Sequence, residues 1–336
     1  ALNKIKSWNL DIIHSHTEFG IGIFARIIAK QYNIPLVHTY HTMYEDYVHY
    51  ITKGYFNNTS KKIVEYLTNF YCNQTATELI VPTKKTYDLF KEKYKYTRNV
   101  HIIPTGIEVE KFYKENTDPA KLEEIRKKHG LNKGDFVILY VGRLGQEKSV
   151  DVLIEAHQEL AREYKAKLLI VGDGPDMDTY KNLVHKLKID DNVIFTGKVP
   201  WTEVTLYYQI ADIFATASKS ETQGLTVIEA MAASLPVVAV DDESFRNVII
   251  DGLNGHLFDT KKEYKKYVKS FIDEPSKLQQ FSKQARINAD TYSSKYFAER
   301  VLDVYRLAIN GETSEEKNSV KNGFKATLKG IFKWKK

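Results

Sequence analysis

Short apolar runs alternate with longer amphipathic stretches along most of the chain. A short apolar run fits a buried strand, and a longer stretch with apolar positions three and four apart fits a helix that covers a sheet. The strand candidates are residues 10–14, 35–38, 78–81 and 100–103 in the first half, and 136–141, 167–171, 193–196, 213–215 and 236–239 in the second. Because strands that alternate with helices form parallel sheets, the pattern predicts an α/β fold built from two doubly wound units.

A polar stretch separates the two units. The strand at 100–103 ends in Pro104-Thr105-Gly106, and charged residues are frequent from there to Gly134. The predicted division is an N-terminal domain at 1–107, a linker at 108–134, a second domain at 135–292, a helix at 293–311 and a tail at 312–336. A doubly wound domain normally opens with a strand, a glycine-rich turn and a helix. No such opening precedes Leu10, so we expect the N-terminal domain to be incomplete.

Composition and charge restrict the class of protein. Of the 336 residues, 43% are apolar and 27% charged, which suits a folded protein with two cores. The single cysteine, Cys72, excludes an internal disulfide framework. No apolar run is long enough for a transmembrane helix, and the opening residues lack the apolar core of a signal peptide. We therefore expect a cytoplasmic protein.

The net charge of +6 is concentrated at the end of the chain. Residues 319–336 hold six lysines and no acid, so the basic and acidic residues of the remaining chain balance. This distribution argues against a nucleic-acid-binding surface over the whole protein and favours one local anionic partner.

The segment 218–233 carries the strongest chemical signal, because it follows a strand candidate and opens a helix. Gly224 permits close approach of a ligand to the backbone. The amide groups of Leu225, Thr226 and Val227 at the helix start would suit a phosphate group. The segment therefore predicts a phosphate site at a helix N-terminus.

Two carboxylates belong to the same segment. Glu221 would lie in the loop before the helix, and Glu229 about one turn inside it. One could bond the hydroxyls of a sugar and the other those of a ribose, with a diphosphate between them. The alternative is an acidic residue that only favours the helix dipole, together with a solvated glutamate.

A second loop, 141–149, also joins a strand candidate to a helix. It would bring Arg143 and Lys148 to the carboxyl edge of the same sheet, where ligands bind in open α/β sheets. An Arg fork and a Lys point charge suit a diphosphate leaving group, whose charge grows as its bond to a sugar breaks. A basic turn that pairs with Glu147 is the alternative.

With these motifs the chain resembles the retaining glycosyltransferases of family 4, which have the GT-B fold. The resemblance extends to about Gly311 and rests on residues 142–148, 171–175, 195–197, 221–229 and 251–255. It implies two Rossmann-like domains that face each other across a cleft, with the 293–311 helix packing back toward the N-terminal domain. It also implies a UDP-linked sugar donor, used without a metal or other cofactor. The implied donor-binding residues are Gly142, Arg143, Lys148, Gly172, Gly224, Leu225, Thr226, Val227 and Glu229, and the implied catalytic residues are His41, Arg143, Lys148 and Glu221.

The N-terminal half supports a narrower resemblance. Residues 38–47 and 221–226 are similar to segments of bacterial diacylglycerol glucosyltransferases. This similarity implies transfer of glucose from UDP-glucose to diacylglycerol, with His41 bonding the transferring sugar or the leaving oxygen. The candidates for the acceptor side are Tyr44, Asp46 and Tyr47. The tyrosines of this region could form the entrance for a lipid acceptor, and packing in the core is an equal alternative.

The tail after Gly311 has the pattern of a basic amphipathic helix. Its lysines and its apolar residues recur at spacings of three and four, which puts them on separate stripes. The predicted membrane-binding residues are Lys321, Phe324, Lys325, Leu328, Lys329, Phe332, Lys333 and Trp334. We expect reversible attachment to the inner face of the cell membrane through an anionic surface. A disordered basic tail is the alternative.

Two other functions stay open. The same fold could act on another acceptor, such as a cell-wall polymer or a glycoprotein. A catalytically silent partner subunit is a candidate from another class, and the complete set of Arg143, Lys148, Glu221 and Glu229 argues against it. The sequence does not distinguish glucose from galactose, because the two sugars differ at a single hydroxyl.

Overall fold

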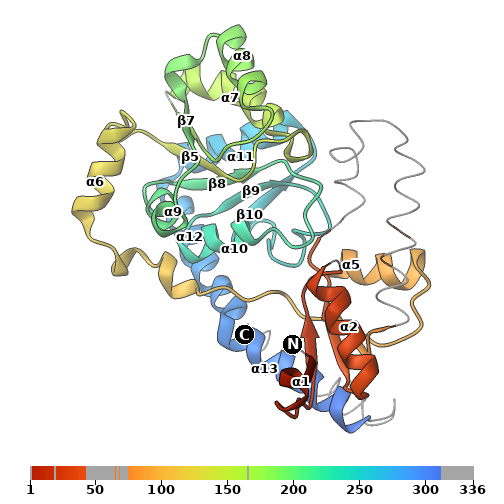
Figure 1. Cartoon of the computed structure of the whole chain (residues 1–336). Helices are drawn as coiled ribbons and strands as arrows, with labels where there is room; N and C mark the ends of the chain where they lie inside the picture. Colours follow the sequence, from red (N-terminus) through yellow and green to blue (C-terminus); the bar gives the residue numbers. More distant parts are fainter. Residues whose placement is uncertain are drawn as a thin grey trace, which may run out of the picture.

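The N-terminal domain contains a parallel sheet with helices packed beside it (Figure 1). The computed structural model describes residues 2–18, 20–42, 65, 68, 75–164 and 166–311. The described strands are β1 (Ile13–Ser15), β2 (Leu36–Thr39), β3 (Glu78–Val81) and β4 (Val100–Ile102), in the order β1-β2-β3-β4. The described helices are α1 (Leu2–Lys6), α2 (Ile21–Tyr32) and α5 (Lys84–Asp88), and α5 continues into a π-helical turn at Leu89–Lys93.

The C-terminal domain is a second doubly wound unit. Its strands are β5 (Val137–Val141), β6 (Lys167–Val171), β7 (Val193–Gly197), β8 (Ile213–Thr216), β9 (Val237–Val240) and β10 (Gly255–Phe258), in the order β10-β9-β8-β5-β6-β7. Its helices are α7 (Val150–Tyr164), α8 (Met177–Leu187), α9 (Trp201–Gln209), α10 (Leu225–Ala232), α11 (Lys261–Asp273) and α12 (Pro275–Ala289). The strand order reverses between β5 and β8, and ligands bind beside such a switch point.

The predicted α/β class with parallel sheets is confirmed. All strand pairs in both sheets are parallel. Every residue of β2, β3, β8 and β9 is buried, as expected for strands covered on both faces. This burial explains why these strands appear in the sequence as continuous apolar runs.

Two strands differ from the sequence-based expectation. The candidate at 10–14 begins as a strand only at Ile13, because a turn with Asn9 in a left-handed conformation (φ 48°) leads out of α1 and leaves Leu10 exposed. β10 was not predicted, since Gly255 and His256 interrupt its apolar pattern. Gly255 lies so close to β9 that a Cβ atom there would meet the Val237 carbonyl oxygen at 2.3 Å.

The linker is partly built into the C-terminal domain. It contains two 3₁₀ turns, Val109–Phe112 and Lys114–Asn116, and α6 (Pro119–Lys128). Val109 and Phe112 are buried in the core of the second domain. The stretch predicted as a polar linker therefore carries its own apolar anchors.

The helix α13 (Ser294–Asn310) joins the two domains from below in Figure 1. It follows α12 of the C-terminal domain, yet its residues Val301, Val304 and Ala308 pack against the N-terminal strands, at Val37 and Ile80. None of the described helices is long and apolar enough to cross a membrane.

Candidate functional site

A cleft of about 390 Å³ lies between the domains at the carboxyl ends of their strands. Its N-terminal wall includes His41, Pro82 and Thr105. The predicted site residues that line it are His41, Gly142, Arg143, Lys148, Glu221, Gly224, Leu225 and Thr226. A larger hollow of about 570 Å³ lies at the opposite, amino-terminal edge of the second sheet, next to Phe136 and Asp212. That edge is remote from the loops where α/β sheets bind ligands.

Lys148 and Glu221 form an ion pair in this cleft. The Lys148 ammonium donates to Glu221 Oε1 over 2.6 Å, and both side chains are largely shielded from solvent. Lys148 ends a 3₁₀ turn, Gln146–Lys148, which follows β5, whereas Glu221 lies in the loop after β8. Because β5 and β8 are neighbours, the two loops meet at the switch point. The geometry joins two residues that are 73 positions apart in sequence.

The N-terminus of α10 faces the cleft. Gly224 precedes the helix with φ 73°, a conformation that favours glycine, and no side chain caps the helix start. A Cβ atom on Gly224 would also meet the Phe245 ring at 2.4 Å. Leu225 and Thr226 line the cleft, so the positive end of the helix dipole points into it.

Val227, the third predicted phosphate-binding amide, differs from Leu225 and Thr226 because it does not line the cleft. Its N–H group donates to the Gly224 carbonyl oxygen over 3.0 Å, and the residue is fully buried. The amide therefore closes the first turn of the helix in this structure, and its predicted contact with a phosphate stays a prediction.

Two other predicted donor residues are not among those that line the cleft. Gly172 follows β6 with φ 142°, and a Cβ atom there would meet the Gly142 carbonyl oxygen at 1.9 Å. Gly172 is thus required for close packing of the loop that carries Gly142, and it is not among the residues that line the cleft. Its predicted role in binding the donor stays a prediction.

Glu229 is also absent from the cleft lining. Its carboxylate is buried and accepts a hydrogen bond of 2.6 Å from the Tyr208 hydroxyl. Burial raises the pKa of Glu229, and the hydrogen bond from Tyr208 opposes that shift. In this structure Glu229 ties α10 to α9, and its role toward a ribose stays a prediction.

A cluster of histidines that sequence reasoning missed lies next to His41. His16 Nδ1 lies 2.9 Å from His41 Nε2, and the two rings stack with their centroids 5.2 Å apart. The His14 ring lies 4.1 Å from that of His16. His14 itself bonds Thr39 Oγ1 and the Tyr305 hydroxyl, each at 2.7 Å. The signal was the alternation of His14-Ser15-His16 at the end of a strand, since alternate residues point to the same face.

Burial keeps these imidazoles neutral. Desolvation, with a smaller contribution from the neighbouring histidines, lowers the pKa of His14 to about 3 and that of His41 to about 4. The pKa of His16 is lowered for the same reasons. At neutral pH the hydrogen bond between His16 and His41 therefore joins two uncharged rings, one of which donates.

Several predicted residues lie outside the described part of the chain. These are the acceptor candidates Tyr44, Asp46 and Tyr47, and the tail residues Lys321, Phe324, Lys325, Leu328, Lys329, Phe332, Lys333 and Trp334.

Comparison with known protein families gives two matches. The model of the glycosyl transferases group 1 matches residues 121–288, and that of Glycosyltransferase Family 4 matches residues 1–111. The first match covers the loops of Lys148 and Glu221, and the second covers the histidine cluster.

Curated relatives and solved structures agree with these families. The chain is 37% identical over 311 residues to alpha-monoglucosyldiacylglycerol synthase of Acholeplasma laidlawii, covering 90% of this chain and 77% of that protein. It is 40% identical over 259 residues to the protein of the same name from Streptococcus pneumoniae, covering 77% of this chain and 58% of that protein. The crystal structure of Anabaena Alr3699/HepE in complex with UDP superposes with a TM-score of 0.74 at 19% identity, covering 90% and 81% of the two chains.

Proposed function

The chain belongs to the family 4 glycosyltransferases, and we propose that it transfers glucose from UDP-glucose to diacylglycerol with retention at the anomeric carbon. Two relatives with 37% and 40% identity carry the name alpha-monoglucosyldiacylglycerol synthase, which supports a glucosyltransferase that acts on diacylglycerol. A structural neighbour was solved with UDP-glucose, which supports a donor of that class.

The contact between Lys148 and Glu221 is the observation that carries the proposal. It lies at the point where the α10 N-terminus and the loop of Arg143 converge on one cleft. In the proposed complex the diphosphate lies against the helix N-terminus, with Arg143 and Lys148 offsetting its charge. These cationic side chains take the role that a metal ion has in other enzymes. Glu221 then holds the hydroxyls of the glucosyl group.

The proposed reaction needs no protein nucleophile. Among the described residues that line the cleft, Glu221 is the single carboxylate, whereas retaining glycosidases use two. The bond between the glucosyl carbon and the diphosphate breaks, and a bond to the diacylglycerol oxygen forms on the same face. The hydroxyl proton passes to the departing diphosphate. Arg143 and Lys148 stabilise the charge that grows on this leaving group, so their effect is greatest in the transition state.

We further propose that the enzyme works as a peripheral protein on the inner face of the cell membrane. A diacylglycerol acceptor is confined to a bilayer, and the lysine-rich tail supplies charge that an anionic lipid surface attracts. The relatives named for a glycolipid product support this location.

The test supplies labelled UDP-glucose, and separately UDP-galactose, with anionic vesicles that contain diacylglycerol. We expect labelled lipid from UDP-glucose and none from a Glu221→Gln variant, which keeps the size of the side chain but removes its charge. Equal labelling from UDP-galactose would mean that glucose is not the specific donor sugar. Binding of UDP-glucose without any labelled lipid would rule out diacylglycerol as the acceptor.

A further inference from the structure

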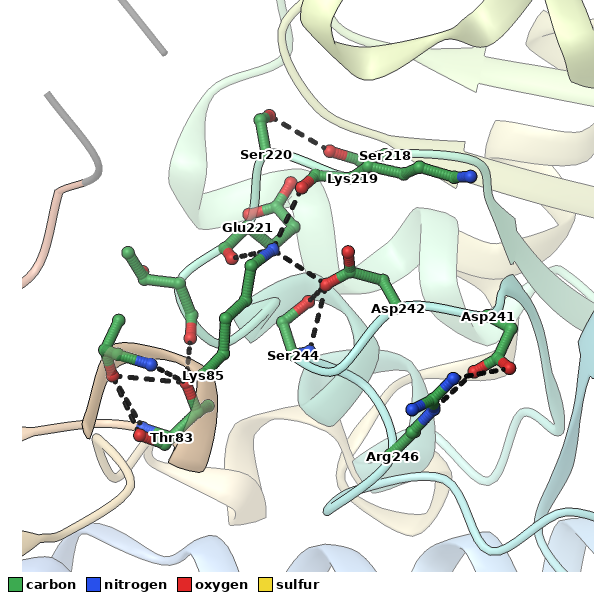
Figure 2. Close-up of polar contacts among 12 residues, drawn as sticks. Thr83, Lys85, Ser218, Lys219, Ser220, Glu221, Asp241, Asp242, Ser244 and Arg246 are labelled. Atoms are coloured by element: carbon green, nitrogen blue, oxygen red, sulfur yellow. Dashed lines mark hydrogen bonds and ion pairs between the residues drawn. The ribbon is translucent and has the colours of Figure 1, made fainter. Parts of the chain in front are cut away.

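The two domains touch next to the site through α5 and the loop that follows β8. Figure 2 shows Lys85 extending from α5 toward this loop. Its ammonium donates to the carbonyl oxygens of Lys219, at 3.0 Å, and Glu221, at 3.4 Å, and to Asp242 Oδ1 at 2.9 Å. One N-terminal side chain thus contacts the backbone of the residue proposed to hold the donor sugar.

The local sequence fixes where Lys85 lies. β3 ends at Val81, and Thr83 caps α5 through a capping box with Thr86. This cap sets the start of the helix, so Lys85 belongs to its first turn. The preceding residue, Lys84, pairs instead with Asp88 of its own helix. Two adjacent lysines therefore have different partners, one in each domain.

Lys85 also joins two separate loops of the C-terminal domain. Glu221 follows β8 and Asp242 follows β9, and these strands are neighbours in the sheet. Asp242 Oδ1 is held in place by the backbone N–H and the hydroxyl of Ser244, at 2.9 and 2.7 Å. The side chains of Lys85 and Asp242 are only 19% and 14% exposed. A charge shielded to this extent needs its partners, because their loss leaves it poorly solvated.

Uncharged contacts continue this junction on either side. The Thr83 hydroxyl donates to the Thr222 carbonyl oxygen, and the Thr222 hydroxyl donates to the His41 carbonyl oxygen, each at 2.8 Å. The buried Gln223 side chain exchanges two hydrogen bonds with the backbone of Thr105, at 2.7 and 3.0 Å. Four of the five residues of the segment 219–223 are consequently supported by the opposite domain, and Ser220 bonds within its own domain.

We propose that Lys85 is a positioning residue that couples the approach of the two domains to the placement of Glu221. When the domains are together, Lys85 fixes the backbone of the loop from the N-terminal side while Lys148 fixes the Glu221 carboxylate from the other. When they separate, the loop loses its only charged support from the N-terminal domain among the described contacts. The consequence for catalysis rests on the proposed function, in which Glu221 binds the donor sugar.

The first test is hydrogen exchange on the unliganded chain, comparing Lys85→Met with wild type. We expect faster exchange of the amides in residues 219–223 in the variant. Lys84→Met is the matched control, since it removes the neighbouring ammonium without touching the other domain. Lys85→Arg keeps the charge and is expected to restore most of the protection.

The second test follows the kinetics of glucosyl transfer. We expect Lys85→Met to raise the KM for UDP-glucose by about tenfold, the size expected for one charge-assisted hydrogen-bonding group. Lys84→Met should leave the KM unchanged, and Lys85→Arg should recover it in part. A merely structural role would lower the melting temperature of Lys85→Met without a change in KM.

The hydrogen-exchange test and the kinetic test distinguish a failure of the positioning role from a failure of the proposed function. Equal exchange of residues 219–223 in Lys85→Met and wild type would overturn the positioning role, whatever the donor. Faster exchange with an unchanged KM would overturn its link to the donor. A wild-type chain that does not use UDP-glucose would refute the proposed donor, and the exchange comparison would still decide whether Lys85 holds the loop.

Discussion

The imidazoles of His14, His16 and His41 form a group whose charge depends on pH. Their neutral forms are favoured in the folded chain, because burial and mutual proximity oppose protonation. In the unfolded chain these histidines would titrate near the ordinary pKa of 6.5. The folded and unfolded states therefore bind different numbers of protons in mildly acidic solution.

The sign of the resulting pH dependence is fixed. A folded-state pKa lowered to about 4 for His41 and about 3 for His14 means that the unfolded state takes up protons first as the pH falls. The stabilisation is fully present above pH 6.5 and is lost as the pH falls toward 4 and 3. We expect the urea midpoint to decrease over this range, and to decrease less steeply in His14→Gln.

His185→Gln is the matched control for that prediction. The His185 side chain lies on the surface, 86% exposed, and its partner Asp190 is also exposed, so this pair contributes little and the variant should keep nearly the wild-type slope of stability against pH. The account of the cluster fails if His14→Gln and His185→Gln show the same slope.

Single residues differ in how far the sequence could reveal them. Glu221, Lys148 and Gly224 belong to local motifs after strands, so their place at the sheet edge was predictable. The contact of His16 with His41 depends on the pairing of β1 with β2, a long-range feature that no local pattern contains. The burial of Glu229 depends on α9, which supplies Tyr208.

At the level of elements, the start of α10 shapes the edge of the cleft where we propose that the diphosphate binds. Gly224 combines a positive φ of 73° with a close approach to Phe245. Gly130, just after α6, has a similar φ of 64° but open space where a Cβ atom would lie. A comparison of substitutions at these two glycines therefore separates the cost of backbone strain from the cost of a steric contact.

We expect Gly224→Ala to destabilise the fold more than Gly130→Ala does. Backbone strain costs about 1–2 kcal/mol at either position. The contact with Phe245 adds about 1–3 kcal/mol at Gly224 alone, and it shifts the helix start that faces the cleft. Denaturant unfolding measures the difference, and UDP titration should show weaker binding only for Gly224→Ala. Equal losses of stability would contradict the close approach.

Elements were predictable where both faces of a strand are buried, as in β8 and β9, because burial leaves a continuous apolar run. β10 was not predicted, because Gly255 and His256 interrupt its apolar run. Gly255 is there to allow the close approach of β9. The apolar anchors Val109 and Phe112 were hidden in a charged segment, where two residues are too few to give a pattern.

For the whole molecule, α13 is the helix that leaves the C-terminal domain and packs against the N-terminal one. Its apolar residues pack against the N-terminal sheet although it follows the last helix of the C-terminal domain. The resemblance to a GT-B enzyme implied such a return, whereas the individual contacts that join the domains at Lys85 and Gln223 could not be predicted from local patterns. They link residues more than 100 positions apart.

Removal of the chain after Gly311 tests the function of the tail. We expect the truncated protein to keep its fold and to lose most of its binding to anionic vesicles, because the cut removes seven lysines against three glutamates and retains α13. Vesicle flotation at low and high salt measures this, and binding of the full chain should weaken with salt. Neutral vesicles serve as the control. Undiminished, salt-independent binding of the truncated protein would place membrane attachment elsewhere.

The central claim is that a nucleoside diphosphate binds in the cleft between the α10 N-terminus and Lys148. Calorimetric titration with UDP tests it most directly, on wild type, Lys148→Met and the surface control Lys186→Met. We predict one binding site in wild type, an affinity about tenfold or more lower in Lys148→Met, and wild-type affinity in Lys186→Met. Equal affinity in all three proteins, or no binding of UDP by wild type, would contradict the account.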